Sequence, residues 1–223
     1  MGINNNIALI RKRLGYSQEE VANHLGVSRQ TFMKMEKDGG QVTTSQLEEL
    51  SKYFGVPVVE FYYEVQNIDK FKEMYLYILS KFPGCGVPKT KLAKLLYLSD
   101  FRHFYDNLES MSGVLYKCKE YGPLADPFLE LTDDMFEKGE INIDFLVQGA
   151  QMVKLSKSTK LGKSNLLSDL EKKEIDEICE AWRNENTQSI VNFTHNQKPW
   201  MLCRPNEVIP YELILQEDPD SVY

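Results

Sequence analysis

The chain has 223 residues, of which 42% are hydrophobic and 26% are charged, and its formal net charge is −7. This length is enough for two domains with separate cores, and the composition is that of an ordinary globular protein. The sequence has no apolar run long enough to span a membrane and no secretory signal at its start, so we expect a cytoplasmic protein without membrane contact. The four cysteines are scattered without a C-x-x-C spacing, so we expect no metal, no cofactor and no disulfide.

Three short helices are predicted at the start of the chain. Apolar residues at helical spacing predict a first helix over residues 4–14, with an inner face made of Ile7, Ile10 and Leu14. The next helix begins after Ser17, which can accept a hydrogen bond from the first turn, and Glu20 completes a capping box. Gly26 can end this helix in the left-handed conformation, and Ser28 can cap the third. This arrangement is typical of a helix-turn-helix.

The third predicted helix has an outward face that suits the edges of DNA bases. Phe32 and Met35 mark its inner side. In a major groove, Arg and Lys pair with guanine, Gln pairs with adenine, and Thr can touch the thymine methyl group. The candidate DNA-contacting residues on and beside this helix are Ser28, Arg29, Gln30, Thr31, Lys34 and Lys37.

Residues 7–61 resemble the phage-repressor, or xenobiotic-response-element, class of helix-turn-helix domain. The resemblance implies an operator DNA partner and a phosphate contact from Gln18, and we expect the DNA-bound form to be a homodimer. It also implies an ion pair between Arg11 and Glu36 that braces the first and third helices, and we expect this pair to be partly exposed. Residues 1–64 carry seven Lys/Arg and eight Asp/Glu, against nineteen and twenty-five in the remainder, so the excess acid lies mainly outside this domain.

The rest of the helix-turn-helix region is expected to complete a five-helix domain. A turn is predicted at residues 38–40, and Thr43 or Thr44 can cap a fourth helix that ends near Phe54. A short final helix follows over residues 58–62. The connection at residues 63–67 has no Gly/Ser tract, so the next domain should be attached closely.

The second part of the chain begins with strongly apolar helices. These are predicted over residues 68–81 and 90–105, and a strand follows over residues 113–118. Gly122 and Pro123 are expected to form a turn that opens a helix over residues 126–138, where proline is tolerated in the first turn.

Strands and helices alternate in the remainder. Strands are predicted over residues 141–145 and 152–155, which together favour a small sheet. Ser168 caps a long amphipathic helix that should bury Leu170, Ile175, Ile178, Cys179 and Trp182. A further helix begins at Thr187, and the acidic tail over residues 216–223 is expected to be poorly ordered.

Three segments of this second part resemble the Panacea domain, also called the SocA-like antitoxin domain. They are residues 91–101 (KLAKLLYLSDF), 113–123 (GVLYKCKEYGP) and 189–200 (SIVNFTHNQKPW), and the resemblance covers roughly residues 68–211. It implies an antitoxin module that neutralises a cognate toxin protein by direct binding. We expect structural roles for the motif residues, including packing of the Tyr97 and Tyr121 rings; they are Tyr97, Asp100, Tyr121, Gly122, Pro123, His195 and Trp200.

Three classes of function remain open: an autoregulating antitoxin, a repressor whose second domain senses a small ligand, and an enzyme. Asp100 and His103 share a helix face and could form a general base pair. The sequence lacks a Gly-rich phosphate loop, H-E-x-x-H and a nucleophile elbow, so we expect no enzyme. The predicted fold is mainly α: a helix-turn-helix domain over residues 1–64, an α-rich α+β domain over residues 68–215, and the tail.

Overall fold

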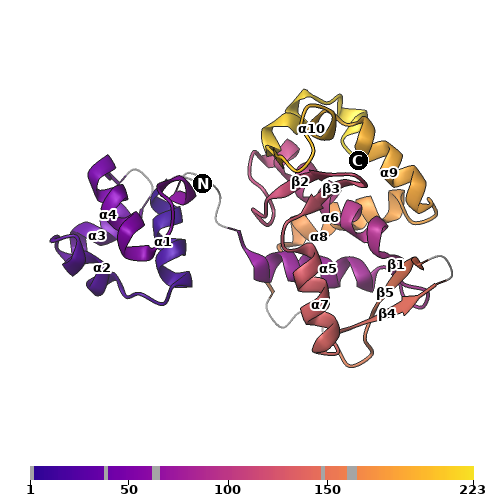
Figure 1. Ribbon diagram of the computed structural model, residues 1–223, viewed down its shortest axis with the longest axis horizontal. Helices are drawn as coiled ribbons and strands as arrows, with labels where there is room; N and C mark the ends of the chain where they lie inside the picture. Colours follow the sequence, from indigo (N-terminus) through magenta and orange to yellow (C-terminus); the bar gives the residue numbers. More distant parts are fainter. Residues whose placement is uncertain (1–2, 38–39, 62–65, 147–148, 160–164) are drawn as a thin grey trace. The chain divides into compact units, whose positions relative to one another are not determined.

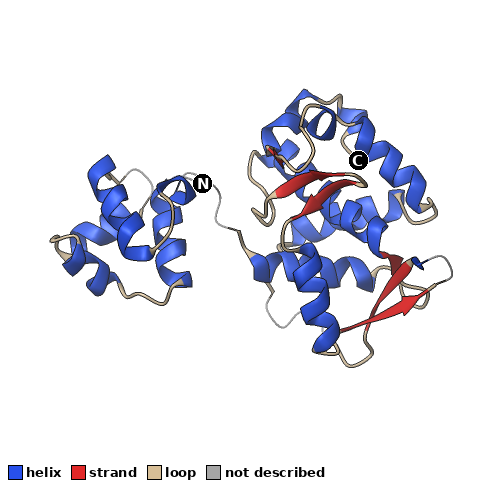
Figure 2. Cartoon of the chain, in the orientation of Figure 1, coloured by secondary structure: helices blue, strands red, loops and turns tan. Residues whose placement is uncertain are grey.

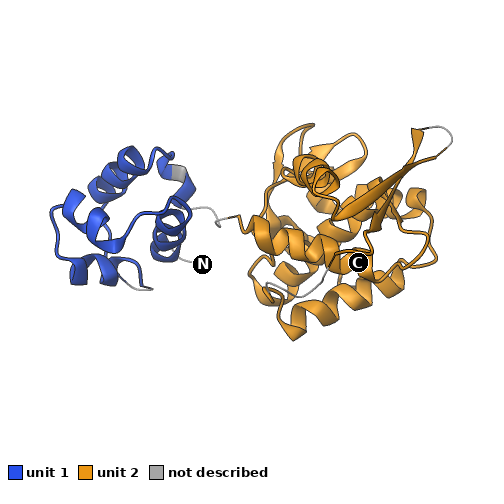
Figure 3. Ribbon diagram, turned by 90° about the horizontal axis from the view of Figure 1, so that it is seen from below, with its two compact units in different colours: residues 1–65 blue, residues 66–223 orange. Residues whose placement is uncertain are grey.

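The chain forms two compact units, Met1–Val65 and Gln66–Tyr223, and each has a hydrophobic core of its own (Figure 3). The predicted turn at 38–40, the end of the helix at 58–62 and the connection at 63–67 lie partly outside the described residues. The computed structural model describes residues 3–37, 40–61, 66–146, 149–159 and 165–223.

The described residues of the N-terminal unit are helical, in the predicted order (Figure 2). The fifth element is a short 3-10 helix, because the four residues that form it allow only a single tight turn. The elements are α1 (Ile3–Arg13), α2 (Gln18–His24), α3 (Arg29–Met35), α4 (Thr44–Phe54) and η1 (Val58–Phe61).

Side-chain caps mark where α2, α3 and α4 begin. The Ser17 hydroxyl accepts a hydrogen bond from the Glu20 amide, and the Glu20 carboxylate accepts one from the Ser17 amide, so the predicted capping box is present. Ser28 starts α3 in the same way by accepting from the Thr31 amide at 3.0 Å. These contacts use backbone donors that would otherwise lack a partner in the helix.

Apolar residues from all five elements form the core of the N-terminal unit. Leu14 was predicted to join them but is 41% exposed, because α1 ends at Arg13 and the helical register does not continue through it. The buried hydrophobic residues are Ile7, Ile10, Val21, Ala22, Phe32, Met35, Leu47, Leu50, Phe54 and Phe61.

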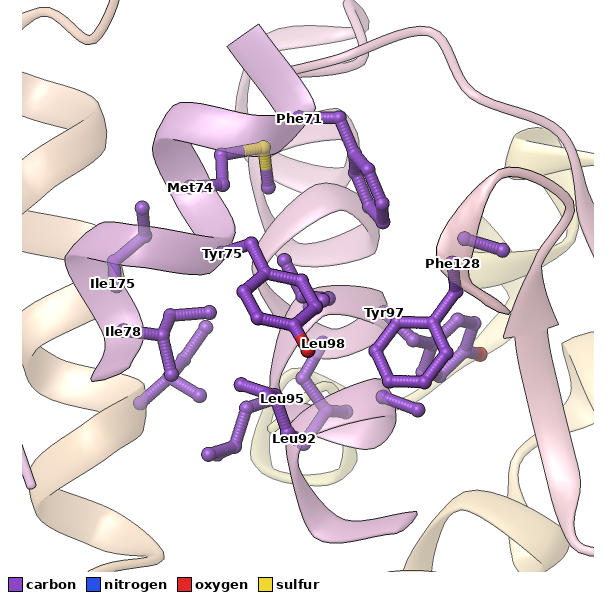
Figure 4. Packing of buried hydrophobic residues seen from close by; sticks show 14 of the residues in the cluster. Phe71, Met74, Tyr75, Ile78, Leu92, Leu95, Tyr97, Leu98, Phe128 and Ile175 are labelled. Carbon is purple, nitrogen blue, oxygen red and sulfur yellow. The ribbon is translucent and has the colours of Figure 1, made fainter. Parts of the chain in front are cut away.

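The C-terminal unit is organised around α6 (Lys89–Asn107), which is buried on nearly every side along most of its length (Figures 1 and 4). Side chains of α5 and α8 pack against it, as Phe71, Tyr75 and Ile175 show in Figure 4. The predicted apolar helices are therefore confirmed as the centre of this core. The other helical elements are α5 (Ile68–Ser80), α7 (Phe128–Glu137), α8 (Asp169–Ala181), α9 (Thr187–Asn196), α10 (Lys198–Met201), η3 (Tyr211–Gln216) and η4 (Pro219–Ser221).

The described residues of this unit form two three-stranded antiparallel sheets, where the sequence indicated one small sheet (Figure 2). The predicted strands near residues 141–145 and 152–155 pair with each other, with Ile143 opposite Val153. The first sheet has the order β1 (Val87–Pro88), β5 (Gln151–Leu155) and β4 (Ile141–Phe145). The second has the order β3 (Gly122–Ala125), β2 (Tyr116–Lys119) and β6 (Val208–Ile209).

Gly122 and Pro123 do not form the helix-opening turn that we predicted. They lie in β3, where Pro123 is paired with Cys118 of β2, and α7 begins only at Phe128. β3 is an edge strand, so the missing N–H of proline is tolerated there. Gly122 has a φ of +91°, a conformation that L side chains rarely adopt, and this allows the tight reversal between β2 and β3.

The C-terminal tail is packed against the unit, so the expectation of poor order was wrong. Val222 is 2% exposed, and the Gln197 side-chain amide donates hydrogen bonds to the carbonyls of Ser221 and Val222. The Arg102 guanidinium lies 3.8 Å from the centre of the Tyr223 ring. Burial of Val222, the two hydrogen bonds from Gln197 and the cation–π contact of Tyr223 therefore hold this acidic segment against the unit.

Leu170 also differs from the prediction, because it is 51% exposed although the other four expected residues of α8 and its end are buried. It lies on the first turn of α8, directly after the Ser168 cap and next to Asp169. The apolar face of α8 that meets the core is made by Ile175, Ile178 and Cys179.

The buried charged residues of α6 bind partners outside the helix, whereas the buried Ser99 hydroxyl donates to the Leu95 carbonyl within it. Asp100 is fully buried and accepts hydrogen bonds from the Ser112 amide at 2.8 Å, the Ser112 hydroxyl at 2.5 Å and the Tyr116 hydroxyl at 2.9 Å. His103 instead contacts the Glu174 carboxylate at 2.7 Å. Asp100 and His103 are therefore used separately to join α6 to its neighbours, and they do not form the base pair that their spacing allowed.

We predict that Asp100 makes the stability of the C-terminal unit depend on pH. Burial raises the pKa of its carboxyl to about 6, although hydrogen bonds from Ser112 and Tyr116 lower it. The folded-state pKa lies above the unfolded value, so the stabilising contribution is complete below about pH 4 and is lost as pH rises through about 6. The wild type should lose about 1–2 kcal/mol relative to Asp100→Asn between pH 5 and pH 7.5.

Urea unfolding followed by tryptophan fluorescence measures this difference, because both tryptophans, Trp182 and Trp200, belong to the C-terminal unit. Parallel pH profiles for the two proteins would contradict the prediction. Carbon-13 NMR of the Asp100 carboxyl gives its pKa directly and does not require the variant to fold.

Candidate functional site

Helix α3 presents a polar face to solvent because its two apolar side chains hold the opposite face in the core. Phe32 is fully buried and Met35 is 3% exposed. Arg29, Gln30 and Lys34 lie on the exposed side. No described carboxylate forms an ion pair with Arg29 or Lys34, so their charges are available to a ligand.

The other predicted DNA-contacting residues have less uniform surroundings. Lys37 is exposed just after α3. Ser28 and Thr31 are exposed, but their hydroxyls lie 2.8 Å apart and form a hydrogen bond with each other. Gln18 is half-buried, and its side-chain amide donates to the Glu36 carboxylate at 2.7 Å. An amide NH2 has two N–H donors, so the second N–H of Gln18 remains available to a phosphate while the first binds Glu36.

The carboxylate of Glu36 joins the first three helices. It accepts from Arg11 Nε at 2.6 Å and from Arg11 Nη2 at 3.2 Å, in addition to Gln18. Arg11 Nη1 also donates to the Tyr16 carbonyl at 2.7 Å. The expected pair is present, but the expectation that it is partly exposed was wrong, because both residues are 7% exposed. The packing of α1 against α2 and the end of α3 excludes water from both charges.

Two further contacts that we did not predict position the helix-turn-helix. The Asn4 side chain donates to the carbonyls of Met35 at 2.7 Å and Gly40 at 2.8 Å, which ties α1 to the end of α3. The His24 ring stacks on Tyr53, with 4.0 Å between ring centres, and so joins α2 to α4. A polar residue in a first turn and a lone histidine carry no local signal for such partners, because the partners lie far away in the sequence.

In the C-terminal unit, the expected ring packing is present for Tyr97 and absent for Tyr121. Tyr97 is fully buried against Phe101 and Tyr116, at ring-centre distances of 4.3 Å and 5.6 Å, whereas Tyr121 is 67% exposed. Tyr121 lies in the exposed turn between β2 and β3. The Tyr97 hydroxyl is buried without a hydrogen-bond partner among the described residues.

The remaining motif residues converge on a buried lysine. Lys94 is 2% exposed, and its Nζ donates to the Pro123 carbonyl at 2.7 Å. The His195 ring stacks on Trp200 at 4.1 Å, with an angle of 9° between the rings. A Cβ at Gly122 would lie 3.0 Å from Lys94 Nζ and 3.1 Å from His195 Cδ2, so glycine allows these groups to approach. The sequence did not single out Lys94, because lysines are common on helices.

The charge state of this cluster is set by burial. Burial lowers the pKa of the Lys94 amine to about 7. Burial and the nearby charge of Lys94 lower the pKa of His195. Neither group has a described carboxylate partner, so both favour the neutral form more than they would in water.

The described residues contain no group of His, Cys, Asp and Glu side chains that could hold a metal ion. Burial raises the pKa of Cys179 to about 12, which makes this thiol a packing residue. In the part of the chain that the structure describes, no helix has the length and apolar character needed to cross a membrane.

Comparison with known proteins identifies the N-terminal unit. Residues 7–61 match the family described as helix-turn-helix. The chain is also similar to a protein described as the cryptic phage CTXphi transcriptional repressor RstR of Vibrio cholerae, with 36% identity over 62 residues. The match covers 27% of this chain and 56% of that repressor, so the chain spans little more than half the length of the curated relative it matches.

The C-terminal unit matches a second family. Residues 92–201 match the family described as antitoxin SocA-like, Panacea domain. No solved structure gives a significant match to the chain. Domains of these two kinds are typically non-enzymatic.

We predict that removing the Glu36 carboxylate strongly destabilises the N-terminal unit. Glu36→Ala leaves the Arg11 guanidinium buried without its counter-ion, which should cost about 3–5 kcal/mol. Urea unfolding followed by far-ultraviolet circular dichroism measures the loss, and tryptophan fluorescence reports the C-terminal unit separately.

The matched control is Glu60→Ala. Glu60 pairs with Arg13 at 3.3 Å, but the side chains are 42% and 47% exposed, so the expected change is below about 0.5 kcal/mol. Equal unfolding midpoints for the two variants would show that burial does not set the strength of the Glu36 pair.

Proposed function

Because the chain carries a phage-repressor-type helix-turn-helix domain and a SocA-like Panacea domain, we propose that it is an antitoxin that represses its own operon. In this proposal the Panacea domain neutralises a cognate toxin by direct binding. The helix-turn-helix domain binds operator DNA as a homodimer. The protein acts in the cytoplasm by binding, without catalysing a reaction.

The observation that carries the DNA-binding part is the exposed face of α3. Arg29, Gln30 and Lys34 project from one short helix whose opposite side is fixed by Phe32 and Met35. A recognition helix needs both an exposed polar face and a buried apolar face, because base contacts require free donors on a rigid support. The near-neutral charge of residues 1–64 indicates a small number of phosphate contacts, so a second copy would add to the affinity.

The Panacea domain is suited to protein binding by its surface as well as by its family. Several large apolar side chains remain exposed on it, and such residues are enriched at the centres of protein interfaces. The most exposed of them are Phe145 at 71%, Tyr121 at 67%, Leu108 at 64%, Met201 at 62% and Leu202 at 58%. Its separate core allows the two domains to bind their partners independently.

A second candidate function is a repressor that responds to a small ligand and has no toxin partner. A cavity of about 450 Å³ in the C-terminal unit, beside Lys94, favours it. The two candidates differ in one outcome. An antitoxin rescues growth when the toxin encoded alongside it is produced, whereas a ligand-responsive repressor does not.

We predict that Arg29→Ala and Gln30→Ala each weaken operator binding by about 1–3 kcal/mol and relax the preference for one base pair. Fluorescence anisotropy with the DNA upstream of the protein's own coding sequence measures the affinity, and single-base variants of that DNA measure the preference. Lys34→Ala should give a comparable loss.

The control for charge is Lys52→Ala, since Lys52 is an exposed lysine on α4, outside α3. It should leave the base preference unchanged. If Arg29→Ala and Gln30→Ala bind as tightly as the wild type, α3 does not read the bases in the proposed register.

We predict that the full-length double variant Arg29→Ala/Gln30→Ala still neutralises the toxin after it has lost operator binding. The two residues lie in the N-terminal unit, and the proposal assigns neutralisation to the other unit. Co-production with the toxin, scored by growth, tests this. Continued growth arrest in the presence of soluble, folded double variant would show that the helix-turn-helix domain takes part in neutralisation.

A further inference from the structure

A pocket of about 450 Å³ lies within the C-terminal unit, next to the first turns of α6. Its walls come from α6, β3, the start of α7 and the loop before β5. Much of the lining is apolar, through Ala93, Leu124, Phe128 and Leu129. A volume of this size and an apolar lining with few polar groups are typical of small-molecule sites.

Lys94 is the most buried of the polar residues that line this pocket. Lys94 lines it but is only 2% exposed, and its one described hydrogen bond goes to the Pro123 carbonyl. A protonated lysine has three N–H donors, so two remain without a described acceptor. An ammonium group held among apolar walls gains most from a partner that brings a negative charge.

The charge of the described lining is entirely positive. Lys89, Lys94 and Lys119 line the pocket, and no described Asp or Glu does. This is unusual for its setting, because the chain beyond residue 64 carries a net charge of −6. The unit is therefore rich in acidic residues, but none of those described lines the pocket. Lys94 has no described carboxylate of the protein beside it there as a counter-ion.

The backbone next to Lys94 keeps this corner open. A Cβ at Gly122, which also lines the pocket, would lie 2.8 Å from Lys94 Cε and 3.1 Å from His195 Cδ2, so a side chain there would force the end of Lys94 to move. His195 also lies next to Gly122, and its Nε2 is buried without a hydrogen-bond partner among the described residues. The corner therefore holds two nitrogen groups with unused hydrogen-bonding capacity.

We propose that this pocket binds a small amphiphilic acid, with Lys94 as the counter-ion of its carboxylate and the apolar walls around its hydrocarbon part. The concave shape and the volume favour a free small molecule over a segment of another protein. This site goes beyond the proposed antitoxin function, because toxin and operator binding do not require it. It would allow a metabolite to act on the Panacea domain.

The test compares octanoate with 1-octanol, which share an alkyl chain of eight carbons and differ in charge. Isothermal titration calorimetry with the full-length wild type should show octanoate binding about tenfold or more tightly than octanol, because only the acid pairs with the buried amine. Lys94→Met keeps the length of the side chain and removes its charge. It should abolish the preference for octanoate while octanol binding is retained.

Lys91→Met is the matched control. Lys91 is also a buried lysine of α6, 5% exposed, but its Nζ donates to the carbonyls of Arg183 and Glu185, and it does not line the pocket. The variant should keep the preference for octanoate. If it loses the preference as fully as Lys94→Met does, the effect is one of stability and the site is not as proposed.

A second variant tests the site if Lys94→Met does not fold. Leu129 lines the pocket and is 50% exposed, so Leu129→Asp places a carboxylate at its wall with little cost to the core. It should weaken octanoate more than octanol, since like charges repel.

Besides a loss of preference in Lys91→Met, three results would overturn the proposal. They are equal binding of the two probes to the wild type, no binding of either probe, and an unchanged preference in both pocket variants. If octanoate does not bind and Lys94→Met abolishes toxin neutralisation, the pocket belongs to the toxin interface. Failure of the ligand test leaves the growth-rescue test of the antitoxin function unaffected.

Discussion

The burial of α6 is the constraint on which the C-terminal unit depends. A helix that is apolar on most of its circumference must be covered on every side, so α5, α8, α9, β3 and η3 all pack around it. Its four buried Lys, Asp and His residues then need partners in the covering elements. Lys91 binds backbone carbonyls after α8, Asp100 binds the segment leading into β2, and His103 binds α8. Lys94 binds a carbonyl of β3, and of these four it is the one whose surroundings also form a pocket.

In the N-terminal unit, a buried charged group also joins several helices. Its helices are too short to be stable alone, so their mutual orientation comes from packing and from one buried charge pair. Glu36 receives donors from Arg11 on α1 and Gln18 on α2 while lying at the end of α3. The carboxylate therefore fixes the angle at which α3 presents Arg29 and Gln30. A contact within the core thus determines the geometry of a surface that we assign to DNA.

The two units carry different kinds of surface. The N-terminal unit exposes cations on a capped, rigid helix, whereas the C-terminal unit is acidic overall, exposes isolated large apolar side chains and encloses a positively charged pocket. Separate cores mean that a change in one surface need not alter the other. This separation is what an autoregulating antitoxin requires, and it also allows a small acid to regulate the Panacea domain.

The sequence by itself determined the features that depend on neighbouring residues. Residue spacings of three and four predicted the caps at Ser17 and Ser28 and the outward face of α3. The apolar side chains of residues 90–105 predicted a buried helix. The structure contains all of these features. Only the tertiary structure decided which distant groups meet. The burial of the Arg11 ion pair, the place of Gly122 in a strand, and its approach to Lys94 depend on how separate elements pack. Helical periodicity records which face is buried, but it contains no information about the partner that will cover that face.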